Sequence, residues 1–317
     1  MIGSTETTSI DLQESSPAMP RRVLKWIGFP RLRPERTSHT PLVLVNGLAE
    51  QSESWFANER HLASRFDLKV PEILLYGGDA LHRWIDAGND VTVDYLTRRL
   101  ETYLDEFVQR PPYHFTASSL GCQVVLTYAV ANPEKVGRLV LICPSGFHGD
   151  ENLPMIEGVR RSRYDSLVAS AFHEPRFADD RLVGAFERKF QDRRWKKGVL
   201  RTLRGTVGHS VEHLLHQVAS PTLVVWGAED QVLSDVPGSI RAGDRIPDVR
   251  QVVIPQCGHA PQIEKSRLVN KLIDRFLNDR LGPLPSELDP SGFLVADAPS
   301  EAAPRLASPS PPPLLPS

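Results

Sequence analysis

The 317-residue chain is long enough to bury a substantial core, and its 40% hydrophobic and 24% charged residues are ordinary for a soluble globular protein. Its 37 Lys and Arg against 39 Asp and Glu give a net charge of −2, which speaks against a nucleic-acid partner, because holding a polyanion normally takes a basic excess. The three cysteines have no metal-ligand spacing, and their odd number favours free thiols over disulfides. The sequence shows no secretory signal and no apolar run near the ~20 residues of a membrane span, so we expect a cytoplasmic protein.

The two ends of the chain differ in composition from the middle. Residues 1–20 are rich in Ser, Thr and Glu, and residues 282–317 are dominated by Pro, Ser and Ala. Neither end has the periodicity needed to bury a face, so both are expected to be disordered tails. Between them we expect a core made of residues 21–149 and 219–281, interrupted by a helical cap at residues 150–218.

Short apolar runs alternate with longer amphipathic ones through the predicted core. The Val91–Val108 pattern predicts a helix with one apolar face, and Leu268–Phe276 predicts another. Strand–helix alternation of this kind indicates a parallel α/β sheet wrapped by helices, in which ligands lie at the carboxyl ends of the strands. The first helix would bury Leu96, Leu100, Leu104 and Phe107. The expected strands are Leu42–Val45, Phe115–Ala117, Leu139–Cys143, Thr222–Trp226 and Val249–Ile254.

The first expected strand runs directly into Asn46-Gly47-Leu48. The glycine permits a turn that would let the N–H of Leu48 face a site at the strand's end, where it could stabilise an oxyanion. An ordinary Asn-Gly turn would look the same in the sequence. Leu48 is therefore a candidate oxyanion donor that depends on a nucleophile nearby.

A serine that fits a nucleophile follows the second expected strand. Ser119 stands between the strand and a helix, with the small residues Ala117 and Gly121 two positions to either side. This spacing suits a tight turn that exposes the serine hydroxyl, and the N–H of Leu120 at the helix start could bind an oxyanion. A helix N-cap serine would show the same local pattern.

The remaining parts of a catalytic triad follow in chain order. A serine hydroxyl needs a general base, which is itself oriented by a carboxylate. Asp230 comes after the strand ending at Trp226, and His259 comes after the strand ending at Ile254, which places both at the same sheet edge as Ser119. The order Ser, Asp, His is that of the α/β-hydrolases.

These residues resemble the α/β-hydrolase superfamily over about residues 40 to 280. The resemblance lies in LVLVNGLAEQSESW, FTASSLGCQVVLTYAVANPEKVGRLVLICPSG, PTLVVWGAEDQVL and IPQCGHAPQIEKSRLVNKLIDRFL. It implies an eight-stranded, mostly parallel sheet flanked by helices, with an inserted helical cap. It also implies Ser119 as nucleophile, Asp230 as acid, His259 as base, and Leu48 and Leu120 as oxyanion donors. Ala260 stands where members that cleave carbon–carbon bonds often have Trp.

We therefore expect a serine hydrolase of the carboxylesterase kind, acting on an ester, lactone or thioester through an acyl-enzyme without cofactor or metal. The same triad could instead serve carbon–carbon or amide hydrolysis or acyl transfer. A non-catalytic scaffold that binds a small molecule or a protein is the alternative from another class. The sequence gives neither the natural substrate nor the oligomeric state.

Three further features of the expected cap and its exit leave alternatives open. His209, His213 and His216 could share a helix face, but they lack the carboxylate or cysteine expected of a zinc site, so we expect a connector there. Residues 151–218 hold 13 Lys or Arg and 9 Asp or Glu, which could attract an anionic substrate or form solvated faces. The cap aromatics could line an acyl pocket or hold the cap to the body: Tyr164, Phe172, Phe177, Phe186, Phe190 and Trp195.

Overall fold

A parallel β-sheet forms the centre of the computed structural model, which describes residues 40–50, 52–149, 161 and 163–282. In the described residues the sheet has six strands in the order β2-β1-β3-β4-β5-β6, and every neighbouring pair is parallel. The prediction of a parallel α/β sheet is confirmed. The strands are β1 Pro41–Val45, β2 Asp67–Lys69, β3 Tyr113–Ser118, β4 Val136–Ile142, β5 Thr222–Gly227 and β6 Val249–Ile254.

The size of the sheet differs from the expectation. Eight strands were implied by the family resemblance, whereas the described part of the chain contains six. β2 was not predicted, because its three residues, DLK, contain only one apolar side chain and are only half-buried. Residues 1–39 lie outside the described part, so the resemblance to an eight-stranded sheet stays an expectation.

Side chains alternate between the two faces of the sheet, and each face has its own core. Val43 and Val45 of β1 belong to one buried cluster, while Leu42 and Leu44 belong to the other. The same alternation continues through β4 and β5. Because β1 and β5 are buried on both faces, they are almost continuously apolar, which is why the sequence reveals them as short apolar runs.

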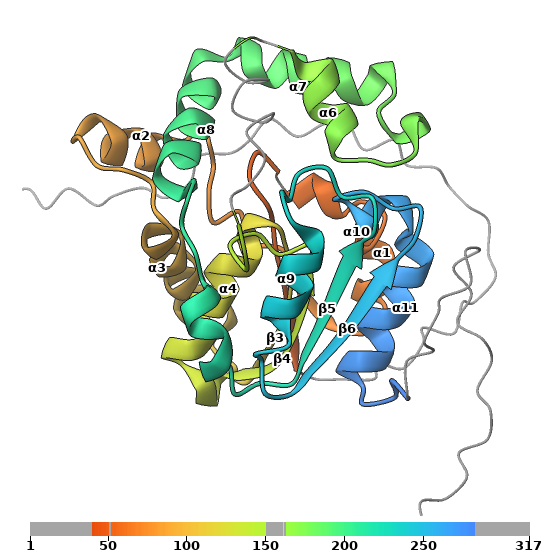
Figure 1. The fold of residues 1–317 in the computed structure, drawn as a ribbon. Coiled ribbons are helices and arrows are strands. Elements are labelled where there is room, and N and C mark those ends of the chain that lie inside the picture. The colour runs from red at the N-terminus through yellow and green to blue at the C-terminus, as the bar shows by residue number, and fades with distance from the viewer. Residues whose placement is uncertain (1–39, 51, 150–160, 162, 283–317) are drawn as a thin grey trace, which may run out of the picture. The chain divides into compact units, whose positions relative to one another are not determined.

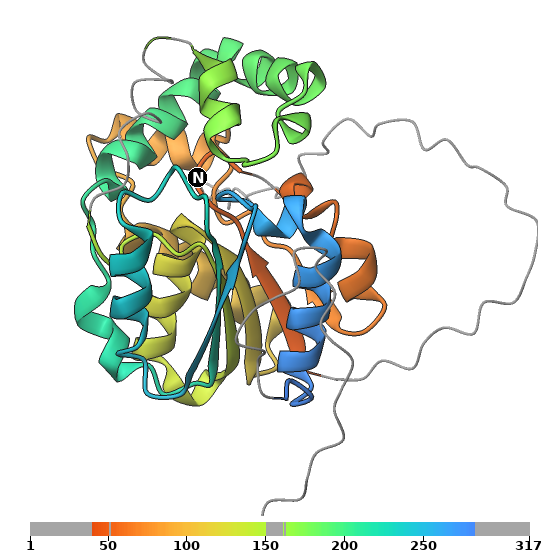
Figure 2. The ribbon, with the colours of Figure 1, turned by 45° about the vertical axis from the view of Figure 1, so that its right-hand side comes forward.

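Helices cover both faces of this sheet (Figures 1 and 2). α3, α4 and α9 lie on one face, and α1 and α11 lie on the other. The α-helices outside the cap are α1 Glu59–Ala63, α2 Asp79–Asp86, α3 Val93–Tyr103, α4 Leu120–Ala131, α9 Val236–Gly243, α10 Pro261–Glu264 and α11 Ser266–Leu277. Short 3-10 helices are η1 Ser52–Trp55, η3 Pro133–Lys135, η4 Pro175–Phe177 and η5 Glu212–Gln217.

The helix expected at Val91–Val108 is present, but its last turn buries a different residue. α3 continues as a π-helical turn, η2, over Leu104–Val108. A π turn holds one residue more than an α turn, so the buried position moves one residue along the chain. Val108 is 5% exposed and Phe107 is 68% exposed, so the prediction that Phe107 faces the core is wrong.

Three helices, α6 Tyr164–Ser170, α7 Asp180–Gln191 and α8 Arg193–Thr206, lie between β4 and β5 in the chain and above the carboxyl ends of the strands in Figure 1. We call α6, α7 and α8 the cap helices. The ring centroids of Phe190 and Trp195 lie 4.6 Å apart. The ring centroids of Trp195 and Tyr76, which follows β2, lie 5.3 Å apart. These aromatic contacts bind the cap helices to one another and to the body.

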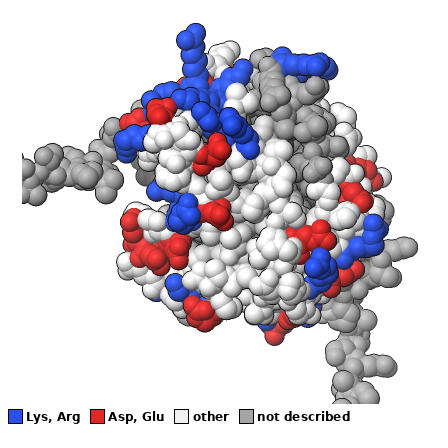
Figure 3. Space-filling view, turned by 60° about the vertical axis from the view of Figure 1, so that its left-hand side comes forward, with Lys and Arg blue, Asp and Glu red and all other residues white. Residues whose placement is uncertain are grey.

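Three basic residues of α8 form ion pairs with the body. Arg194, Lys197 and Arg201 pair with Asp79, Asp86 and Asp90, respectively, which lie on α2 and just after it. All six side chains are between 33% and 64% exposed, as expected for solvated helix faces. Figure 3 shows Lys and Arg side chains over the cap helices, with acidic side chains beside them.

The structure describes only part of the regions for which the sequence predicts tails and a cap. The predicted tails at residues 1–20 and 282–317 lie outside the described residues, except for Gly282. The cap residues 150–160 and 162 also lie outside them. No helix in the described ranges is long and apolar enough to cross a membrane.

Candidate active site

Ser119 occupies a tight turn between β3 and α4. Its backbone has φ 48° and ψ −119°, in the region that non-glycine residues rarely adopt, and its side chain makes no capping hydrogen bond to α4. A Cβ on Gly121 would lie 2.6 Å from the carbonyl oxygens of both Val45 and Asn46, so only glycine fits there. The strained turn and the missing cap bond favour the nucleophile interpretation of Ser119 over a helix N-cap.

Asp230 and His259 are brought together from the ends of β5 and β6. Asp230 Oδ2 lies 2.7 Å from His259 Nδ1, and the two side chains are 1% and 8% exposed. The other carboxylate oxygen of Asp230 accepts N–H bonds from Val232 at 2.8 Å and Leu233 at 3.2 Å. Burial of the carboxyl group favours its neutral form, but His259 and these two amides outweigh burial and hold the pKa of Asp230 below its ordinary value.

The loop that carries His259 is fixed on two sides. Glu229 Oε2 accepts the N–H of Cys257 at 2.9 Å, which ties this loop to the one that carries Asp230. Buried Glu264 accepts the N–H of Gly258 at 2.5 Å through one oxygen and the N–H of Glu174, beside the cap helices, at 2.8 Å through the other. The position of His259 therefore depends on both the sheet and the cap.

Gly227, the last residue of β5, leaves room for this loop. A Cβ there would lie 2.0 Å from the carbonyl oxygen of Gly258 and 2.5 Å from that of Cys257. Gly227→Ala should destabilise the fold by about 1–3 kcal/mol, lowering the thermal unfolding midpoint by several degrees, because backbone atoms must shift. Activity should also fall, because the shift acts on the loop of His259.

The matched control for this prediction is Gly184→Ala in α7. A Cβ at Gly184 meets only the far end of the Arg188 side chain, at 3.3 Å, and alanine suits a helix interior better than glycine by about 0.5–1 kcal/mol. The control should leave the unfolding midpoint unchanged or raise it. Equal midpoints for both variants in differential scanning calorimetry would contradict the close packing at Gly227.

The loop after β1 lies against Ser119. A Cβ on Gly47 would lie 3.1 Å from the Cβ of Ser119 and 3.1 Å from Oε1 of Glu50. The amides of Leu48 and Leu120 donate no hydrogen bond to another described residue, which leaves both available to an oxyanion. We call residues 46–50, which include the predicted oxyanion donor Leu48, the oxyanion loop.

Three side chains hold the oxyanion loop in place. The N–H of Ala49 donates to the hydroxyl oxygen of buried Tyr76 at 2.9 Å. Glu50 Oε2 accepts the N–H of Gly47 and the hydroxyl of Ser118, both at 3.0 Å. The indole N–H of Trp55 donates to the side chain of Asn46 at 2.7 Å. Neither Glu50 nor Tyr76 was predicted from the sequence, although an acidic residue in a loop at a strand's carboxyl end was a usable signal for Glu50.

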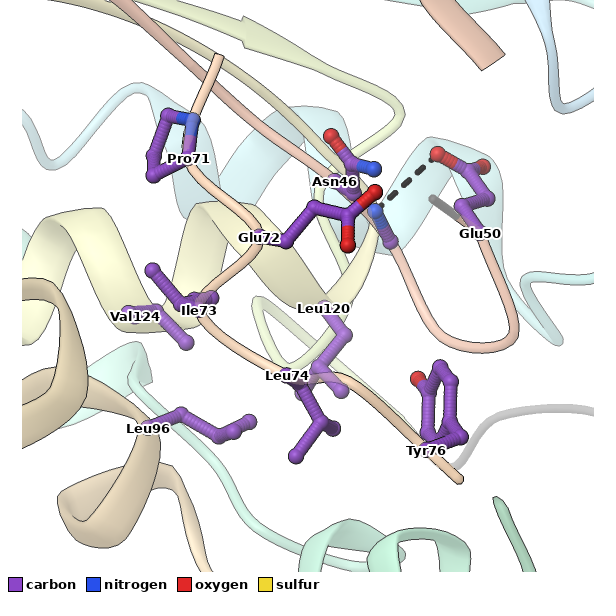
Figure 4. A pocket seen from close by; sticks show the side chains of 11 residues that line it. Asn46, Glu50, Pro71, Glu72, Ile73, Leu74, Tyr76, Leu96, Leu120 and Val124 are labelled. Atoms are coloured by element: carbon purple, nitrogen blue, oxygen red, sulfur yellow. Dashed lines mark hydrogen bonds between the residues drawn. The ribbon is translucent and has the colours of Figure 1, made fainter. Parts of the chain in front are cut away.

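A small cavity opens between the oxyanion loop and α4 (Figure 4). Its volume is about 20 Å³. One water needs roughly 10–15 Å³ of such space, so the cavity has room for one or two waters. Glu50, Glu72 and Tyr76 supply polar atoms, and Leu120 stands at its wall. The other lining residues are Asn46, Gly47, Pro71, Ile73, Leu74, Leu96 and Val124.

One group of potential metal ligands stands out in the described residues. Cys143, just after β4, presents a sulfur whose distances to the ligand atoms of Asp230 and His259 are within 4.8 Å. A thiolate would be needed to bind an ion tightly, and burial together with the charge of Asp230 raises the pKa of Cys143 well above its usual value. The Asp230–His259 contact is the one that the predicted triad requires. The histidines 209, 213 and 216 do not form such a group.

Comparisons with known proteins agree with this architecture. A family model described as alpha/beta hydrolase fold matches residues 40–266. Human monoacylglycerol lipase ABHD6 is 22% identical over 263 residues, covering 76% of this chain and 77% of its own. Two solved structures share the fold: serine hydrolase CCSP0084 from Cycloclasticus zankles and the meta-cleavage product hydrolase CumD from Pseudomonas fluorescens IP01. The first has a TM-score of 0.67 at 19% identity and covers 78% of this chain and 93% of its own. The second has a TM-score of 0.66 at 17% identity and covers 77% and 92%.

Proposed function

Since this chain belongs to the α/β-hydrolase family, we propose that it is a serine hydrolase that cleaves a carboxylic ester, lactone or thioester through an acyl-enzyme. The observation that carries the proposal is the buried 2.7 Å contact between Asp230 and His259, at the same sheet edge as the strained turn of Ser119. A serine hydroxyl, a carboxylate and an imidazole in this chain order have the chemistry of acyl transfer.

In the proposed mechanism His259 Nε2 takes the proton of Ser119 as the hydroxyl oxygen attacks the substrate carbonyl carbon. The carbonyl π electrons move onto oxygen, and the resulting oxyanion is bound by the amides of Leu48 and Leu120. Asp230 accepts the Nδ1–H bond and stabilises the imidazolium. The bond between the acyl carbon and the alcohol or thiol then breaks, and His259 protonates this leaving group. His259 next takes a proton from water as the water oxygen attacks the acyl carbon, and it returns a proton to the serine oxygen as the acid is released.

The proposed substrate class is supported by chemistry and by relatives. Ester cleavage needs only the groups named above, and the human relative is a monoacylglycerol lipase. The likeness to a meta-cleavage product hydrolase shows the fold alone at 17% identity. Ala260, which follows His259, is part of a buried apolar cluster with Val168 and Phe172 of the cap region.

Labelling with a fluorophosphonate tests the proposal directly. The reagent phosphonylates serines that a neighbouring base activates, so the intact protein should gain one phosphonyl group, located by peptide mass spectrometry at Ser119. The rate of hydrolysis of p-nitrophenyl esters of graded acyl length should fall in proportion to the fraction of protein that is labelled. Labelling elsewhere, or none together with no ester hydrolysis, would favour the binding scaffold and overturn the proposal.

A further inference from the structure

Glu50 is a carboxyl group in the oxyanion loop that the proposed mechanism does not use. It is half-buried, and it lines the cavity drawn in Figure 4. Its Oε1 and the Cβ of Ser119 each lie 3.1 Å from the position that a Cβ on Gly47 would take, so the two atoms are at most about 6 Å apart. A charge at Glu50 would therefore act on any oxyanion that forms there.

The two oxygens of Glu50 have different surroundings. Oε2 accepts two hydrogen bonds, from the N–H of Gly47 and the hydroxyl of Ser118. This is the pattern that the carbonyl oxygen of a neutral carboxylic acid would satisfy, with the proton on Oε1. The pKa of Glu50 is raised by burial, which outweighs the two hydrogen bonds and the charge of His259. The neutral form therefore persists to higher pH than for an exposed glutamate.

Within the part of the chain that the structure describes, His259 is the one basic side chain whose charge acts on Glu50. Tyr76 and Cys122 are close enough for the charge of Glu50 to raise their pKa values further, beyond the effect of burial. Glu72 lines the same cavity and accepts the hydroxyl of Ser52 at 2.9 Å. A negative Glu50 would thus lie beside another carboxyl group, near a developing oxyanion, with only His259 as a countercharge.

From this geometry we propose that Glu50 is a positioning residue that works as a neutral carboxylic acid: it holds the oxyanion loop against the nucleophile turn and keeps negative charge away from the oxyanion. The inference rests on the proposed function. As pH rises through the titration of Glu50, the carboxylate keeps both hydrogen bonds but its charge opposes the oxyanion, so acylation slows.

The test compares Glu50→Gln with wild type across pH. Glutamine can accept the same two bonds through its carbonyl oxygen and cannot ionise, so it copies the neutral acid. The ratio of kcat/KM, variant to wild type, should be near one at low pH. It should rise by about 10- to 100-fold at high pH, the size expected for one charge ~6 Å from the oxyanion at an effective dielectric of ~20.

Glu53→Gln is the matched control for the chemical change. Glu53 lies three residues along the chain, is 59% exposed, and pairs with Lys189 of α7. Its variant-to-wild-type ratio should be flat across the same pH range. A rising ratio for both variants would mean a general charge effect and would overturn the assignment to Glu50.

Ser118→Ala gives a second, independent readout. The hydroxyl of Ser118 favours the charged form of Glu50 by donating to it, so its removal should raise the pKa of Glu50. The high-pH decline of kcat/KM should then move to higher pH, even if Glu50→Gln fails to fold. An unmoved decline would contradict the proposal.

The outcomes separate this inference from the proposed function. If wild type is active and labelled at Ser119, but the Glu50→Gln ratio is flat or falls with pH, only the role of Glu50 is wrong. A falling ratio would mean that the carboxylate is needed, as a countercharge for the imidazolium of His259. If wild type neither hydrolyses esters nor takes the label, both proposals fail.

Discussion

Replacing Ser119 by alanine should lower kcat for ester hydrolysis by about 10⁴-fold or more, with a much smaller change in KM. Alanine removes the attacking oxygen but keeps the backbone that presents it, so substrate can still bind while no acyl-enzyme can form. The turn itself should survive, because the Ser119 side chain makes no capping bond that alanine would lose. The measurement is steady-state hydrolysis of the best p-nitrophenyl ester found for wild type.

Ser64→Ala is the control for this result. Ser64 ends α1, where its hydroxyl donates to the carbonyl of His61 at 2.7 Å. This variant should keep wild-type kcat. Traces of contaminating esterases limit the lowest activity that such assays can measure. The Ser119→Ala variant should therefore also take no fluorophosphonate label. Retention of more than about a tenth of wild-type kcat by Ser119→Ala would remove Ser119 from the mechanism.

Much of the sheet could be predicted from the sequence, because burial on both faces leaves a plain mark. Each expected strand is present, and the turn residues Ser119 and Gly121 follow β3 as expected. Asp230 and His259 were placed by a rule of topology: parallel strands bring their carboxyl ends to one edge. Those inferences needed only local pattern and chain order.

The rest depended on contacts that local pattern does not encode. Glu50 looks like a solvated loop residue until the structure shows it held by Gly47 and Ser118. Phe107 fits an α-helical face, and only the π turn at Leu104–Val108 moves it outward. Tyr76 reaches Ala49 across 27 residues of chain. Such non-local contacts decide which polar groups approach the nucleophile.

Asp230→Asn should lower kcat by about 10³- to 10⁴-fold while the fold persists. In the wild type Asp230 Oδ2 accepts from Nδ1 of His259, which leaves Nε2 as the nitrogen that takes the serine proton. The amide nitrogen of asparagine can donate to Nδ1 instead, which would place the imidazole proton on Nε2 and prevent it from acting as a base. Asparagine also lacks the charge that stabilises the imidazolium.

Asp235→Asn controls for the loss of one carboxylate in the same region. Asp235 caps α9 by accepting the N–H of Gly238 at 2.8 Å, and asparagine caps helices about as well as aspartate. Its kcat should stay near wild type. If Asp230→Asn instead kept most of its activity, the 2.7 Å contact with His259 would be structural rather than catalytic.

The double variant Ser119→Ala with Asp230→Asn decides whether the two residues act as one unit. Asp230 works only through His259, and His259 works only on the proton of Ser119, so its removal should cost nothing once the hydroxyl is gone. The double variant should therefore be no slower than Ser119→Ala alone. If the two losses multiplied, Asp230 would contribute to catalysis by a route independent of Ser119, and the proposed triad would be wrong.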